Sequence, residues 1–195
     1  LMTNWQDWIG QQTLVASDLD PAQSQRLQVT LDRESTLKEG STLPPAWHWI
    51  YFYDAFKASQ LGRDGHTKLG ISLPAFPLPH RMWAGGQIHW KSPIVLGTPA
   101  TRATTIKSIE EKSGRTGELI FVTLEHVVKQ NDEVCLVEEQ NIVYREAANT
   151  STAVVPDQAE VDSEFSHSWK FSSTELFRYS ALTFNGHKIH YDQAY

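Results

Sequence analysis

The sequence predicts an α+β fold in which a helical N-terminal part precedes a meander of long antiparallel strands. From Arg81 onward, polar and apolar residues alternate with a period of two over several long segments, as is typical of strands with one buried face. Short turn signals separate these segments, at Gly114 to Gly117 and at Asn131-Asp132. Strands joined by such short turns pair in antiparallel fashion. The chain of 195 residues is long enough for one domain, or for one domain and part of another.

The residues before this meander are predicted to be helix and loop. Asp20 followed by proline is typical of a helix start, so we expect a helix from Pro21 to about Leu31. The segment 43–53 begins with two prolines and continues with aromatic residues, a pattern that suits either a helix or a strand. Residues 62–79 contain several glycines and prolines and are predicted to form a loop, whose length is typical of a binding loop or lid.

Four strands are expected within the meander, at 82–90, 101–112, 119–128 and 134–144. Paired glycines at 85 and 86 predict a bulge or a close backbone approach in the first of them. The single cysteine, Cys135, stands in an apolar run and is predicted to be buried in a strand. One cysteine allows no internal disulfide, and a reducing compartment, the cytoplasm, fits this composition.

A second unit is predicted to begin near residue 165. Residues 147–164 are polar and poor in large apolar side chains, as in a linker, whereas 165–171 suggest a strand. Ser172 and Glu175 have the spacing of a capping box and predict a helix start. The predicted organisation is therefore one domain at 1–146, a linker at 147–164, and the start of a second domain at 165–195, which is too short to bury a core alone.

Three side chains able to orient or transfer a proton follow this last helix, Asn185, His187 and His190, at a turn that Gly186 permits. An imidazole has an ordinary pKa of roughly 6.5 and suits proton transfer near neutral pH, while an amide can orient a water molecule but cannot act as a base. Metal binding by His187, His190 and Asp192 is the alternative. The broken helical periodicity disfavours it, and no metal is predicted.

The segment from Tyr179 to Asp192 resembles the hydratase motif of the MaoC-like enoyl-thioester hydratases and dehydratases. An aromatic residue, Ala-Leu and the final His-x-Asp match, and threonine replaces serine at 183. The catalytic aspartate of that family falls on Asn185. The form Asn-x-His-x-Ile-His-Tyr-Asp is similar to a subfamily that comprises the type 2 hydroxyacyl-thioester dehydratases and the bacterial 3-methylfumaryl-CoA (mesaconyl-C4-CoA) hydratases. Segments 43–52, 79–86 and 138–146 resemble the first half of that subfamily.

This resemblance implies a hot-dog fold, which is an antiparallel sheet wrapped round a central helix. The stretch 43–53 would then be that helix. It also implies a double hot-dog architecture, with 1–146 as the first unit and a truncated second unit that carries the motif. Pairing with another hot-dog unit, or a homodimer, is expected because a half unit leaves a sheet edge exposed.

The implied activity is that of a hydro-lyase that adds water reversibly to a 2-enoyl thioester, with 3-methylfumaryl-CoA as the favoured substrate. His190 and Asn185 are the expected catalytic residues, and His187 or Asp192 would take the second acid–base role. Substrate contacts are expected from Tyr179, Thr183, Arg81 and Trp83, with Arg81 meeting a carboxylate or a CoA phosphate. No cofactor is expected, because CoA is part of the substrate.

Two other functions stay open at this point. One is dehydration of 3-hydroxyacyl groups of fatty-acid metabolism on CoA or acyl carrier protein. The other is a non-catalytic module that binds acyl-CoA, which the replacement of aspartate by Asn185 permits. The net charge of -6 opposes a nucleic-acid surface, and no apolar run is long enough to predict a membrane span.

Overall fold

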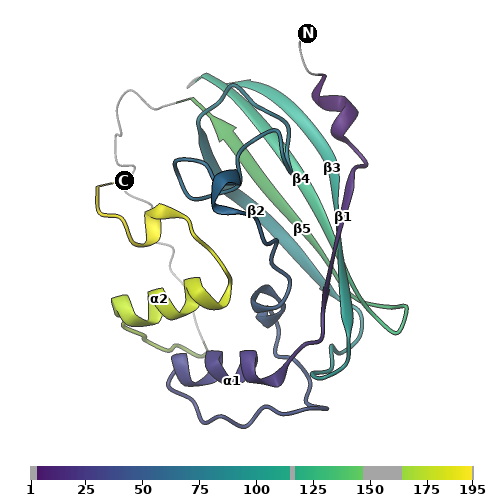
Figure 1. The fold of residues 1–195 in the computed structure, drawn as a ribbon, viewed down its shortest axis with the longest axis vertical. Helices are drawn as coiled ribbons and strands as arrows, with labels where there is room; N and C mark the ends of the chain where they lie inside the picture. Colours follow the sequence, from purple (N-terminus) through teal and green to yellow (C-terminus); the bar gives the residue numbers. More distant parts are fainter. Residues whose placement is uncertain (1–3, 115–116, 147–163, 195) are drawn as a thin grey trace.

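The computed structural model describes residues 4–114, 117–146 and 164–194, and in these residues a single antiparallel sheet carries the fold (Figure 1). Its five strands lie in the order β1-β3-β4-β5-β2. Their bounds are β1 Gln12–Ser17, β2 His80–Trp90, β3 Ala100–Gly114, β4 Gly117–Gln130 and β5 Glu133–Arg145. Two α-helices, α1 Pro21–Thr30 and α2 Ser173–Leu182, pack against each other beside the sheet. The prediction of an α+β fold with antiparallel strands is confirmed.

The four strands expected from the alternation all form, and their turns follow the predicted chemistry. Asn131 and Asp132 both have positive φ values, 48° and 64°, which suits the tight turn between β4 and β5. The register of β2 against β5 shifts between Trp83 and Gly85, so the bulge expected at the glycines is present. Strand β1 was not predicted, because it is short and its side chains are mostly exposed.

The segment 43–79 covers one face of the sheet, and the helix expected at 43–53 is wrong. Only a short 3-10 helix, η2 Trp47–Ile50, forms there, after Ala46 in the left-handed region at φ 68°. Tertiary hydrogen bonds hold this stretch instead. The Tyr51 hydroxyl donates to the Asp20 carbonyl at 2.8 Å and accepts from the Ser24 amide at 3.1 Å. The segment is therefore tied to α1 and does not follow a helical period of its own.

Two clusters of buried side chains form the core between the sheet and this segment. One joins Leu43, Ile50 and Phe52 to the apolar side chains of the strands and to Leu182 of α2, and it contains Cys135, which is buried as predicted. The other joins the loop side chains of Leu73, Phe76 and Leu78 to alternate residues of β3, β4 and β5. The predicted loop 62–79 thus packs on the sheet through its apolar residues.

The C-terminal part matches the prediction at the helix and departs from it before the helix. The Ser172 hydroxyl accepts from the Thr174 amide, and the Glu175 carboxylate accepts from the Ser172 amide at 2.9 Å, so the capping box is confirmed. The strand expected at 165–171 does not form, and Phe165 and Phe171 are exposed there. Most of the predicted linker, residues 147–163, lies outside the described residues.

No helix in the described part of the chain is both long enough and apolar enough to span a lipid bilayer.

Candidate active site

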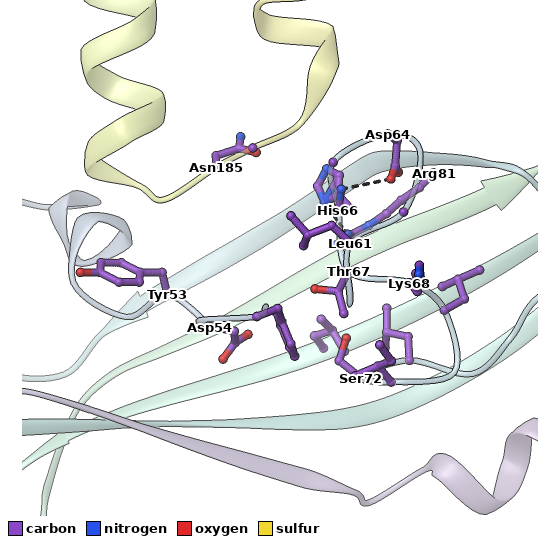
Figure 2. Close-up of a pocket in the computed structure, with 18 of the residues that line it drawn as sticks. Tyr53, Asp54, Leu61, Asp64, His66, Thr67, Lys68, Ser72, Arg81 and Asn185 are labelled. Atoms are coloured by element: carbon purple, nitrogen blue, oxygen red, sulfur yellow. Dashed lines mark hydrogen bonds between the residues drawn. The ribbon is translucent and has the colours of Figure 1, made fainter. Parts of the chain in front are cut away.

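A cleft of about 1480 Å³ lies between the sheet and the loop that follows α2. Its floor consists of inward-facing side chains of the strands, and its walls come from residues 52–81 and from the loop 183–186. Figure 2 shows Asn185 on this loop, above Tyr53 and Asp54 and beside the loop of Asp64 and His66. The most information-rich motif of the sequence therefore opens onto the largest hollow of the described chain.

Local hydrogen bonds shape the motif loop after α2 ends. The Thr183 hydroxyl donates back to the Tyr179 carbonyl at 2.9 Å, and Phe184 then takes a left-handed conformation at φ 52°. The Asn185 side-chain oxygen accepts from the His187 amide at 3.0 Å, which closes a turn of the type that Asn side chains favour. The Phe184 ring packs on Tyr53, with ring centroids 5.3 Å apart, and this contact anchors the loop over the cleft.

The motif loop also docks on residues 62–66 through backbone contacts. The Lys188 amide donates to the Asp64 carbonyl at 2.8 Å. Gly65, at φ 87°, approaches Gly186 so closely that a methyl group on Gly65 would overlap the Gly186 carbonyl. Glycine is required at this position both for its backbone angle and for the absence of a side chain.

Three imidazoles gather where these loops meet. The His66 ring lies 4.4 Å from the His187 ring, and the His187 ring lies 6.0 Å from the His190 ring, measured between centroids. The Arg81 guanidinium lies 3.0 Å from His66 Nδ1. Because a guanidinium can only donate, His66 accepts at Nδ1 and carries its proton on Nε2.

Burial and neighbouring charge keep two of these rings neutral at physiological pH. Burial, reinforced by the positive charge of Arg81, lowers the pKa of His66 to about 4. Burial likewise lowers the pKa of His187, and His187 Nδ1 accepts from the Ile189 amide at 3.1 Å. A neutral imidazole can accept a proton, so the cluster is suited to act as a base.

The lowered pKa of His66 predicts a stability that depends on pH. The fold prefers the neutral ring, so its contribution to stability is complete above the ordinary value of roughly 6.5 and is lost as the pH falls from there toward 4. The slope would be at most about 1.4 kcal/mol per pH unit and smaller in practice, because the ring is partly exposed. Urea unfolding at about pH 5 and about pH 7.5 measures it. In His66→Asn the difference between the two pH values should shrink, and an unchanged difference would assign it to other groups.

The structure brings only part of the predicted site into the cleft. Asn185, Thr183 and Arg81 line it. His190 is exposed on the short 3-10 helix η4 Lys188–His190, and it is not among the residues that line the cleft. The motif therefore presents its amide to the cleft and its second histidine to the rim.

The other predicted residues lie farther from the cleft. Tyr179 is 41% exposed and Trp83 is 67% exposed, and neither is among the lining residues. Asp192 accepts from the Ala194 amide at 3.1 Å and lies 3.9 Å from the Lys188 ammonium. That carboxylate stabilises the end of the motif turn.

Sequence reasoning missed a polar group on the floor of the cleft, which consists of Arg102, Thr104, His126 and Gln140. Thr104 and His126 face each other across β3 and β4, and their side chains are 2.8 Å apart. The signal was present in the sequence, because these polar residues occupy positions of the same parity as the buried apolar ones. Among the described residues, no group of three His, Cys, Asp or Glu side chains is arranged to hold a metal ion.

An antiparallel sheet, its covering segment and a histidine-bearing loop over a cleft define a hot-dog protein with a hydratase-type motif. The chain belongs to the family of type 2 hydroxyacyl-thioester dehydratases, whose model matches residues 46–195. The resemblance stated from the motifs is thereby confirmed, and so is the hot-dog fold class. The described residues do not confirm a truncated second unit.

Three similar proteins support this assignment. Mesaconyl-C(4)-CoA hydratase of Chloroflexus aurantiacus is 41% identical over 194 residues, which are 98% of this chain and 69% of that protein. The mitochondrial hydroxyacyl-thioester dehydratase type 2 of Schizosaccharomyces pombe is 26% identical over 86% of this chain and 61% of its own length. The crystal structure of HtdX from Mycobacterium tuberculosis shares the fold, with a TM-score of 0.56 and 16% identity over 93% of this chain and 66% of that one. This chain thus spans about two thirds of the length of these relatives.

Proposed function

We propose that the protein adds water reversibly across the double bond of a 2-enoyl thioester, with 3-methylfumaryl-CoA as its favoured substrate. The observation that supports this most is the position of the motif loop, which holds Asn185 over a cleft in the sheet face. The name of the relative from Chloroflexus aurantiacus agrees with both the reaction and the acyl group. CoA would enter as part of the substrate, so the reaction needs no cofactor.

Hydration requires a water molecule to lose a proton as its oxygen attacks C3, and C2 to gain a proton. We assign the proton transfer to His190, on the strength of the motif, and the positioning of the water to the Asn185 amide. His187 is the second candidate base, because it lies between His190 and the cleft residue His66. The substrate would have to reach the rim at Gly186, which lines the cleft, for His190 to act.

The size and lining of the cleft suit a long thioester. Ligand pockets for small molecules commonly measure about 300–1,000 Å³, and this cleft is larger. Its apolar residues can accept the pantetheine arm, and cationic side chains at Arg63, Lys68 and Arg81 can meet phosphate groups. The acidic net charge of the chain does not oppose this, because the cations are local.

Dehydration of a 3-hydroxyacyl group on CoA or acyl carrier protein is the second candidate reaction. It is the reverse of the proposed hydration and would use the same residues. The family to which the chain belongs, and the name of the relative from Schizosaccharomyces pombe, favour it. The acyl group, rather than the chemistry, distinguishes the two candidates.

Absorbance of the conjugated enoyl thioester tests the proposal. The purified full-length protein should remove this absorbance when it is incubated with 3-methylfumaryl-CoA, and a saturated or hydrated analogue should show no change. Asn185→Asp keeps the oxygen that accepts from the His187 amide but adds a charge beside the imidazoles, so an enzyme adapted to the amide should lose activity. Absence of turnover by the unmodified protein, with this and every other 2-enoyl-CoA tried, would favour a binding module.

We also propose that the protein pairs with another hot-dog unit, as a homodimer or with a different chain, and that it acts in the cytoplasm. Strand β2 lies at the edge of the sheet, and its outer side has no strand neighbour among the described residues. Trp83 and Trp90 of this strand are more than half exposed, which is consistent with a covered surface. Sedimentation of the purified protein would measure the assembly. The location is inferred from the acyl-CoA substrate, which is intracellular.

A further inference from the structure

Arg102 is a buried cation on the floor of the cleft, and its guanidinium is incompletely paired. One terminal nitrogen donates to the Phe52 carbonyl, and the other lies 3.4 Å from the Asp54 carboxylate. Its Nε is buried and has no hydrogen-bond partner in the described structure. A buried N–H group of a charged side chain that makes no hydrogen bond is costly, so such a group commonly serves a ligand.

The charges around Arg102 leave room for one more anion. Burial and the positive charge of Arg102 lower the pKa of His126, so that ring is neutral beside it. Glu138 is held by His48 at 2.9 Å and by the Trp49 indole at 3.1 Å, which engages its charge elsewhere. Asp54 is 42% exposed at the end of a long contact, so an incoming carboxylate can replace it at little cost.

Arg102 is connected to the motif loop through the wall of the cleft. It contacts Phe52 and Asp54, the residues on either side of Tyr53. The Tyr53 ring in turn packs on Phe184, the residue before Asn185. An anion bound at Arg102 would therefore lie beneath the loop that carries the Asn185 amide, as the position of Asp54 under Asn185 in Figure 2 also indicates.

We propose that Arg102 binds the free carboxylate of a short dicarboxylic acyl thioester and so selects this substrate class over uncharged acyl groups. This inference rests on the proposed function for its biological meaning, but the binding step does not require turnover. In a 3-methylfumaryl thioester the free carboxylate is attached to C3, the carbon that water attacks. Pairing of that carboxylate with the guanidinium would fix C3 under Asn185, with Thr104 and Gln140 as neutral polar neighbours.

Equilibrium binding of two saturated thioesters tests the inference without any reaction. Succinyl-CoA and butyryl-CoA have the same chain length and differ only in a terminal carboxylate or methyl group. The unmodified full-length protein should bind succinyl-CoA more tightly, and Arg102→Gln should reduce the ratio of the two affinities by about 10- to 100-fold. Arg102→Lys, which retains the charge but not the fork of donors, should restore part of the ratio.

Arg33→Gln is the matched control, since Arg33 is an exposed arginine outside the cleft, and its affinity ratio should equal that of the unmodified protein. A thermal unfolding curve shows whether each variant is folded, and Arg102→Lys serves if Arg102→Gln is not. Equal affinity of the unmodified protein for the two thioesters, or an equal loss for both in a folded Arg102 variant, would overturn the inference. A retained affinity ratio in a protein that hydrates no 2-enoyl-CoA would instead refute the hydratase proposal and leave the carboxylate site standing.

Discussion

Replacing His190 with alanine is expected to lower kcat/KM for hydration by about 10²- to 10⁴-fold, the usual contribution of a positioned general acid or base. The ring is exposed on η4 and makes no large packing contribution, so the thermal unfolding midpoint should change little. Loss of activity without loss of stability would separate a chemical role from a structural one. The measurement is the initial rate of absorbance loss with 3-methylfumaryl-CoA.

His167→Ala is a suitable control, because His167 is another exposed histidine of the C-terminal part and lies outside the cleft. It should retain full activity. His187→Ala then distinguishes one base from two, since a comparable loss would show that the two imidazoles share the proton transfer. If His190→Ala keeps more than a tenth of the activity, the assignment of proton transfer to His190 is wrong.

Alanine at Gly65 is expected to destabilise the protein and to reduce activity together. The added methyl group would overlap the Gly186 carbonyl, so the loop 62–66 and the motif loop must separate. Overpacking of this kind typically costs about 1–3 kcal/mol, beyond the cost of the left-handed backbone angle itself. Urea unfolding and the hydration rate measure the two effects, and the activity should fall because Asn185 and the imidazoles move with their loop.

Gly70→Ala isolates the steric part of this effect. Gly70 has the same φ of 87°, but the nearest heavy atom to an added methyl group is the Ala75 Cβ at 3.8 Å. The two variants therefore share the backbone cost and differ only in the contact with Gly186. Equal losses of stability and activity in the two would show that the docking of the loops does not matter.

Local signals in the sequence determine the elements that were predicted well. The strands β3, β4 and β5 follow from alternation, and α2 begins where Ser172 and Glu175 place its capping box. The segment 43–53 could not be predicted in the same way, because distant groups on α1 hold it through Tyr51. The aromatic residues at 165–171 resemble a strand, but in the described chain they have no strand to pair with.

The site was predictable only where a contiguous motif carried it. Asn185 and Thr183 were found because they lie within one short segment, and the structure places both at the cleft. Arg102 and His126 lie on different strands, and only the register of β3 against β4 brings them to one floor. His66 meets His187 through a tertiary contact between loops, for which no local spacing gives a signal.

The meeting of Gly65 with Gly186 constrains the family of sequences that can build this site. The two loops touch through peptide groups, with no side chain between them, so the contact fixes the path and length of each loop more strictly than its composition. A residue inserted in either loop would slide Asn185 along the cleft while leaving every motif letter in place. Relatives with an intact motif but a longer loop at 62–66 should therefore differ in the acyl group that they accept.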